Sequence, residues 1–211
     1  MEKTVYYIDN SLPDAASQLS LSLSACLENM QKSWQELVIL CIGSDRITGD
    51  CLGPICGQKL SGLCASRSFI YGTLSHPVHA LNLSETLVTI LGRHPAGLIL
   101  AIDASLGAED HLGYISAGTG PLIPGAGVKK ELPAVGDIFI TGIVNQSGMF
   151  DRFLLQTTRL STVLRLADTI TLGILNCFSS LDRRRYFQSS LWRKKSSFDP
   201  ALQDLTAFPF L

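Results

Sequence analysis

Apolar residues along the chain form short continuous runs, separated by segments in which apolar positions recur every three or four residues. The strongest continuous runs are 37–42 (LVILCI) and 97–103 (GLILAID). Runs of this length without polar alternation are typical of central strands that are covered on both faces. Weaker strands are predicted at 68–74, 112–118 and 137–144. The pattern therefore indicates a sheet that is mostly parallel.

Helical spacing fills the longer intervals between these strands. Helices are predicted at 11–31, 51–62 and 82–93, and the segment 150–178 is long enough for one helix or two. Pro54 fits the first turn of the second helix, where a missing N–H costs little. Because strands alternate with helices, the sequence predicts a three-layer α/β/α domain with a mostly parallel sheet.

Composition and charge narrow the class of protein. With 46% hydrophobic and 17% charged residues, and a mean hydropathy of +0.25, the chain is able to bury a core. No uninterrupted apolar run reaches the roughly 18 residues of a membrane span, and the N-terminus lacks the layout of a secretory signal. The formal net charge of -1 gives no overall field that favours nucleic acid. We expect a cytoplasmic protein without a membrane or nucleic-acid partner.

The composition changes near the C-terminus. Residues 1–181 are predicted to form a single α/β domain, whereas residues 182–211 are first basic and then aromatic. This tail either packs on the domain or is flexible, and a basic run by itself is usually a solvated face. Self-association into a homo-oligomer stays open.

Two carboxylates mark the carboxyl ends of the two most apolar strands. Asp50 lies in the loop GSDRITGD after residues 37–42, and Asp103 ends residues 97–103. Functional groups of open α/β sheets collect at this edge, so neighbouring strands would bring both carboxylates to one crevice. Close carboxylates share a proton, and one then acts as base on a water while the other acts as acid. The structural alternative is a helix N-cap for Asp50 and an Asx turn for Asp103.

The loops at the same edge supply candidates for substrate binding. Glycines let the backbone approach a ligand, and lysines add positive charge. The Gly/Pro-rich segment 118–136 is either such a binding loop or a surface excursion. The candidate substrate-binding residues are Gly43, Ser44, Asp45, Gly125, Gly127, Lys129 and Asn145.

Metal and cofactor sites are only weakly indicated. The six cysteines include no CxxC pair and no zinc-type spacing, so we expect reduced thiols. His76 and His79 bracket Pro77, and one of them in a site with Asp50 and Asp103 is conceivable, although solvated loop histidines are more common. The sequence therefore predicts neither a metal nor a cofactor.

The motifs GSDRITGDCLGP, AIDASLG and GTGPLIPGAGVKKELPAVGDIFITGIVN resemble the sporulation protein YyaC family over most of residues 35–178. More distantly, they resemble the germination protease of spore-forming bacteria, an atypical aspartic endopeptidase that degrades small acid-soluble spore proteins. The resemblance implies that Asp50 and Asp103 are the catalytic aspartates. It also implies a protein substrate of the spore, and a location in the forespore or the spore interior.

A wider resemblance is to the hydrogenase maturation endopeptidases, which share a phosphorylase/hydrolase-like α/β fold. Those enzymes bind nickel through acidic residues at the positions of Asp50 and Asp103 together with a histidine. The segment that supplies this histidine has no counterpart here, because GVKKELPAVGD contains no His. The expected function is a sporulation-associated endopeptidase with two aspartates as acid and base. The alternatives are a catalytically silent protein- or peptide-binding relative and a metal-dependent maturation-type peptidase.

Overall fold

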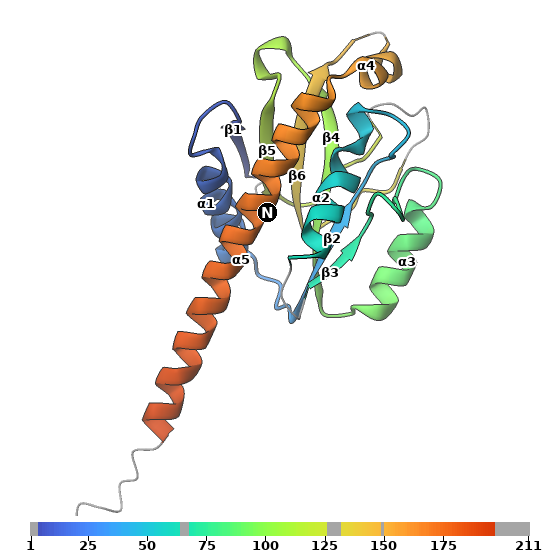
Figure 1. Cartoon of the computed structure of the whole chain (residues 1–211). Coiled ribbons are helices and arrows are strands. Elements are labelled where there is room, and N and C mark those ends of the chain that lie inside the picture. Colours follow the sequence, from blue (N-terminus) through green and yellow to red (C-terminus); the bar gives the residue numbers. More distant parts are fainter. Residues whose placement is uncertain (1–3, 64–67, 126–131, 149, 197–211) are drawn as a thin grey trace, which may run out of the picture. The chain divides into compact units, whose positions relative to one another are not determined.

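A computed structural model describes residues 4–63, 68–125, 132–148 and 150–196, with side chains described up to residue 180. Strands in this part of the chain form one sheet in the order β1-β5-β6-β4-β2-β3 (Figure 1). Strands β3, β2, β4 and β6 pair in parallel, and β5 runs antiparallel to both β6 and β1. The strands are β1 (Val5–Asp9), β2 (Glu36–Cys41), β3 (Ser68–Tyr71), β4 (Gly97–Gly107), β5 (Tyr114–Thr119) and β6 (Ile138–Gln146).

The predicted helices are present, with shorter ends. The segment predicted as one helix or two is divided near Thr158, and its second helix continues to Ser196. A 3-10 turn, η1 (Gly49–Cys51), precedes α2, and another, η2 (Glu109–His111), follows β4. The α-helices are α1 (Ala15–Glu28), α2 (Leu52–Ser61), α3 (Leu83–Arg93), α4 (Asp151–Thr157) and α5 (Leu160–Ser196).

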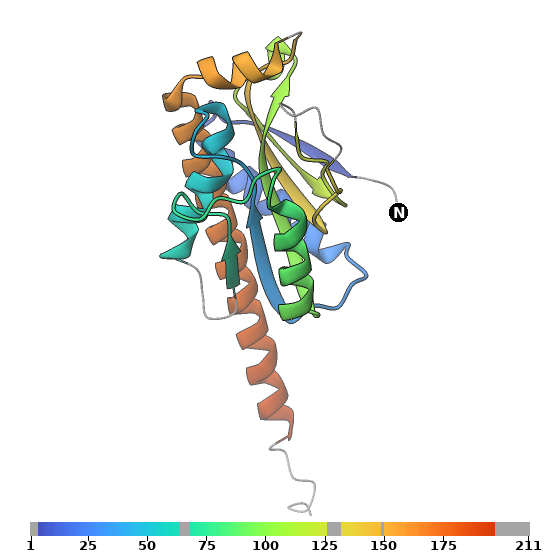
Figure 2. The ribbon, with the colours of Figure 1, turned by 90° about the vertical axis from the view of Figure 1, so that its right-hand side faces the viewer.

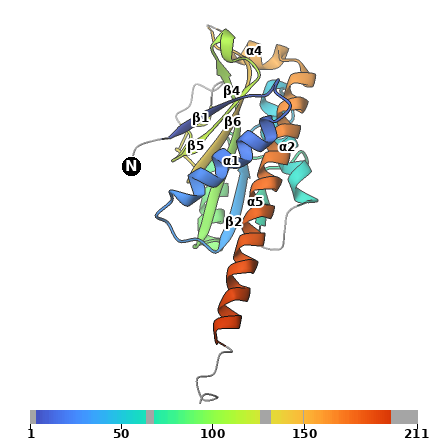
Figure 3. The same ribbon diagram turned by 90° about the vertical axis from the view of Figure 1, so that its left-hand side faces the viewer.

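The helices cover the sheet on both faces, as the sequence predicts. Gly173 of α5 lies against Leu19 of α1, and Gly142 of β6 lies against Leu52 of α2 and Leu166 of α5, so these three helices share one face (Figure 3). Helix α3 lies on the opposite face (Figure 2). There it covers a buried apolar cluster together with residues of the excursion between β5 and β6. The three-layer α/β/α architecture is confirmed. The cluster contains Val38, Leu40, Ile42, Val78, Leu83, Ile90, Ala101, Leu122, Val135 and Phe139.

The first half of helix α5 is apolar, and one of its faces packs into the domain. Within the described residues, its stretch Leu160–Ser180 is long and apolar enough to cross a membrane, judged by length and composition alone. The buried side chains recur every three or four residues, which is the spacing of a single helix face. Burial in the domain therefore accounts for this face without a membrane. These side chains are Val163, Leu166, Ala167, Ile170, Ile174 and Cys177.

The chain divides into two compact units, Met1–Cys177 and Phe178–Leu211, and α5 runs through the boundary. In the segment predicted as a tail, residues 182–196 are helical. Residues 197–211 lie outside the described part of the chain. Whether the tail packs on the domain stays a prediction.

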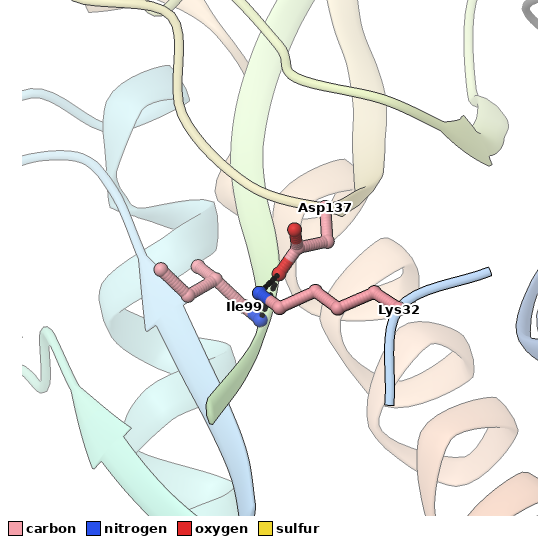
Figure 4. A network of polar contacts seen from close by, with 3 residues as sticks. All are labelled: Lys32, Ile99 and Asp137. Atoms are coloured by element: carbon pink, nitrogen blue, oxygen red, sulfur yellow. Dashed lines mark hydrogen bonds and ion pairs between the residues drawn. The ribbon is translucent and has the colours of Figure 1, made fainter. Parts of the chain in front are cut away.

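The start of β6 is fixed to β4 by Asp137 (Figure 4). The backbone N–H of Asp137 donates to the Ile99 carbonyl at 2.8 Å, and its carboxylate accepts the Ile99 N–H at 2.9 Å. The same carboxylate oxygen forms an ion pair with Lys32 at 2.7 Å. These contacts hold the parallel register in which Asp103 of β4 lies opposite Thr141 of β6.

We expect Asp137→Ala to lower the free energy of unfolding by about 2 kcal/mol, because a hydrogen bond to a charged group is lost. Asp137→Asn keeps an oxygen acceptor for the Ile99 N–H and serves as the matched control, with a smaller loss. Lys32→Met removes only a partly exposed ion pair and costs about 0–1 kcal/mol. Urea denaturation of the full chain measures all three variants. Equal losses for Asp137→Ala and Lys32→Met would contradict the role given to the Ile99 hydrogen bond.

Candidate active site

The loop after β2 turns back on itself and brings Asp50 to the carboxyl edge of the sheet. Gly43 has a φ of 139°, and a Cβ there would overlap the carbonyl oxygen of Asp50, so only glycine fits. The Gly43 N–H donates to the Val78 carbonyl at 2.8 Å, and the Ser44 N–H donates to the Asp50 carbonyl at 3.1 Å. The loop is therefore tied both to the segment before α3 and to its own far end.

Asp50 does not cap the helix that follows it. It lies within η1, and the N-cap position of α2 is Cys51, with no side-chain hydrogen bond. The loop is also held from outside, because Gly49 packs under α4, where a Cβ would lie 2.8 Å from the Leu155 carbonyl oxygen. The carboxylate of Asp50 is thus available for the adjacent cavity.

Asp103 comes from the neighbouring strand. It lies in β4 one position past Ile102, whose carbonyl accepts the Ile42 N–H at 2.7 Å, so it stands beside the end of β2. Alternation along the strand puts its side chain on the face of Ala101, which belongs to the α3-side cluster. The residue is only 7% exposed, and its carboxylate accepts the Ala104 N–H at 2.8 Å.

Both aspartates line one cavity of about 540 Å³. Its walls come from the loop after β2, the turn before α3, the excursion between β5 and β6, and α4. Four of the predicted substrate-binding residues line it as well, namely Gly43, Ser44, Asp45 and Gly125. Gly127 and Lys129 lie outside the described residues.

Asn145 lies elsewhere and is not among the residues of the cavity wall. Its side-chain amide donates to the Leu154 carbonyl at 2.8 Å and to the Thr158 hydroxyl at 3.2 Å, and its side-chain oxygen accepts the Gln146 N–H. These bonds tie the end of β6 to α4. Its predicted contact with a substrate stays a prediction.

The two carboxyl groups differ in their surroundings. Burial, and then the charge of Asp50, raise the pKa of Asp103 well above its ordinary value, and the Ala104 N–H opposes this rise. Burial also raises the pKa of Asp50, but hydrogen bonding from the Ser44 backbone and the nearby His79 lower it. The two groups interact electrostatically, and carboxyl groups that interact in this way are able to share a proton.

Three further residues of the cavity wall carry charge or titrate, and sequence reasoning did not assign them to substrate binding. Arg46 is in the same loop as Asp50, so its position gave a signal. For His79 the sequence offers a metal ligand or a solvated loop histidine as the alternatives. No local sequence pattern marks Arg152 as a site residue, because only the packing of α4 on the loop brings it to the cavity.

The described residues of this site assemble neither a three-ligand metal centre nor a thiol nucleophile. In the part of the chain that the structure describes, no three His, Cys, Asp or Glu side chains are arranged to hold a metal ion. Cys51 is buried, donates its S–H to the Thr48 carbonyl at 2.8 Å, and has a pKa raised by burial. It is a structural thiol.

Comparison with known proteins identifies the family. The family described as "Protein of unknown function (DUF1256)" matches residues 7–173. The chain belongs to the DUF1256 family. It is 41% identical over 190 residues to the uncharacterized protein YyaC of Bacillus subtilis (strain 168), which covers 90% of each chain. The predicted resemblance to the YyaC family is therefore confirmed.

A solved structure is also similar. It is the NiFe hydrogenase maturation protease HycI from Thermococcus kodakarensis KOD1, with a TM-score of 0.48 and 16% sequence identity. The match covers 73% of this DUF1256 chain and 97% of HycI. A similarity at this level carries no information about the chemistry of the site.

We expect Gly43→Ala to lower the free energy of unfolding by at least about 2 kcal/mol, because a side chain at positive φ is strained and its Cβ would meet the Asp50 carbonyl. Gly92→Ala is the matched control, since that helical position opens on empty space and alanine there is expected to stabilise by up to about 1 kcal/mol. Chemical denaturation measures both. A Gly43→Ala protein as stable as the wild type would contradict the described loop.

Asp103→Asn is expected to raise the unfolding temperature at neutral pH. The folded-state pKa of Asp103 lies above the ordinary value of 3.8, so the folded state binds this proton more tightly than the unfolded chain. That contribution to stability is present below pH 3.8 and is lost as the pH rises through the folded pKa. Asparagine removes the loss and keeps an acceptor for the Ala104 N–H. Thermal unfolding across pH measures the difference, which should vanish near pH 3.8.

The exposed Asp45 provides the control for this experiment. It lines the same cavity but is exposed, so Asp45→Asn should leave the unfolding temperature nearly unchanged at both pH values. An Asp103→Asn protein less stable than the wild type at neutral pH would show that the carboxylate is paired in the folded state.

Proposed function

We propose that this DUF1256 protein is a sporulation-associated endopeptidase in which Asp50 and Asp103 are the catalytic acid–base pair. The observation that carries the proposal is that Asp50, from the loop after β2, and Asp103, from the adjacent parallel strand β4, line one cavity. Their electrostatic interaction and the burial of Asp103 support the sharing of one proton. The carboxyl edge of a parallel sheet is also where α/β proteins carry their sites.

Such a pair hydrolyses a peptide bond without a cofactor. The ionised carboxylate takes a proton from a water molecule as the water oxygen bonds to the peptide carbonyl carbon. The protonated carboxyl group gives its proton to the carbonyl oxygen, which avoids a build-up of negative charge. The C–N bond then breaks, the amine leaves with a proton from the first carboxyl group, and the second regains a proton from the new hydroxyl groups.

The proposed substrate is a protein made during sporulation or stored in the spore, and the proposed location is the forespore or the spore interior. The motif resemblance to the germination protease supports both proposals. A cavity of about 540 Å³ lies within the roughly 300–1,000 Å³ of typical ligand sites and is large enough for side chains that flank a cleaved bond. Its apolar wall residues, among them Leu81 and Leu132, suit a polypeptide substrate.

The decisive experiment is a cleavage assay on small acid-soluble spore proteins, followed by mass spectrometry of the products. Asp50→Asn and Asp103→Asn are each expected to lower kcat by at least about 100-fold, because each removes a proton-transfer group. Asp110→Asn, which is exposed and lies outside the cavity wall, is the matched control and should keep kcat within a few fold. Full activity in both of the first two variants would contradict the assignment.

The same assay separates the alternatives. Activity that is lost with a chelator and restored by one metal would favour a metal-dependent peptidase instead. Tight binding of the spore proteins, without cleavage at any pH between the pKa values of the two aspartates, would favour a binding protein that has no catalytic activity. We expect cleavage that is indifferent to chelator.

A further inference from the structure

Several hydrogen bonds fix the backbone around His79. Its backbone N–H donates to the side-chain oxygen of Asn82 at 2.8 Å, and the Asn82 amide donates to the Pro77 carbonyl at 3.0 Å. The His79 carbonyl accepts the N–H groups of Asn82 and Leu83 at 3.1 and 2.9 Å, which starts α3. The backbone on both sides of His79 is therefore fixed to the start of α3.

The imidazole is oriented as well. The Leu81 N–H donates to Nδ1 of His79 at 3.3 Å, so Nδ1 is the acceptor and the neutral ring carries its proton on Nε2. Protonation of Nδ1 would remove that hydrogen bond and place a full positive charge on the ring. His79 lines the cavity together with Asp50 and Asp103.

The two carboxylates lie in different surroundings. Burial raises the pKa of Asp50, and the charge of His79 opposes this rise. Asp103 is more deeply buried and receives the Ala104 N–H. Asp50 is half-buried whereas Asp103 is buried, so a negative charge loses less hydration on Asp50, and His79 lines the same cavity; the negative charge therefore belongs on Asp50 and the proton on Asp103.

The other charged residues of the cavity wall do not reverse this asymmetry. Asp45 and Arg46 come from the loop after β2, and Arg152 comes from α4. All three are exposed, so solvent and salt screen their effect on the buried pair. Among the described residues that line the cavity, His79 is thus the titratable group best placed to favour one carboxylate over the other.

We propose that His79 is a positioning residue that assigns the roles within the pair, with Asp50 as the general base and Asp103 as the general acid. This inference rests on the proposed function. Asp50 removes the proton from the attacking water, and Asp103 protonates the carbonyl oxygen. When the C–N bond breaks, the proton held by Asp50 passes to the amine and a proton of the new hydroxyl groups returns to Asp103, so both groups end as they began.

Carboxyl-carbon NMR of labelled aspartates tests the assignment in the full chain without any need for activity. In the wild type, Asp50 is expected to ionise at a lower pH than Asp103. His79→Asn keeps an oxygen that accepts the Leu81 N–H but removes Nε2, and it should shift the titration of Asp50 upward by about one pH unit. His76→Gln is the matched control, because His76 is exposed in the same connection and does not line the cavity. It should shift neither titration.

Two results would overturn the inference. One is a wild type in which Asp103 ionises before Asp50, and the other is an Asp50 titration that His79→Asn leaves unmoved. If His79→Asn fails to fold, His79→Gln is the second variant. Its neutral amide reaches the position of Nε2, so the shift should be smaller but in the same direction.

Cleavage then separates this inference from the proposed function. With an active enzyme, His79→Asn should move the acidic limb of the kcat profile upward by the same amount as the Asp50 titration, with KM little changed. The expected titrations in a protein that cleaves nothing would sink the proposed function, and with it the base and acid roles, but would leave the effect of His79 on the Asp50 titration standing. If the wild type cleaves but His79→Asn leaves the acidic limb of the kcat profile unmoved, the proposed function stands and the role of His79 is contradicted.

Discussion

Helix α2 packs on β2 so closely that backbone meets backbone, and the position of the site depends on this contact. A Cβ on Gly53 would overlap the Ile42 carbonyl, and a Cβ on Gly57 would overlap the carbonyl of Gly72, which itself lies on Cys41. Because the helix starts against the strand that precedes it, the connecting loop has to turn back sharply, and Gly43 provides the turn. Larger residues at these positions would lift α2 from the sheet and carry Asp50 away from the cavity.

The order of the strands explains why a cavity forms at this place. The chain passes from β2 to β3 on one side and then returns to β4 on the other side of β2. Helix α2 lies on one face of the sheet and α3 on the other, so their connections diverge above the ends of β2 and β4. The turn before α3 closes the cavity from the far side, since Val78 pairs with Ile42 and accepts the Gly43 N–H. The cavity is thus a consequence of topology, and its chemistry comes from what the loops carry.

The two continuous apolar runs are the sequence patterns that predict the fold best. The runs at 37–42 and 97–103 became β2 and β4 because strands covered on both faces have no polar alternation. Strand β1 was missed because it is a short edge strand whose residues are mostly half-buried. The pair Asp50 and Asp103 followed from a rule about strand ends, whereas Arg152 reaches the cavity only through the packing of α4, which no local pattern contains.

The free-energy cost of burying the Asp103 carboxylate points to a role in function. Its carboxyl group is buried and interacts electrostatically with Asp50. An asparagine oxygen at this position would accept the hydrogen bond from the Ala104 N–H equally well. A purely structural role would therefore be filled better by a neutral amide, which carries no penalty for burial of a charge. Groups held at such a cost collect at sites of chemistry, where the perturbed proton affinity is what the reaction uses. The same reasoning separates Asp103 from Asp137, whose half-buried carboxylate oxygen is matched by an N–H and an ammonium group and whose role is structural.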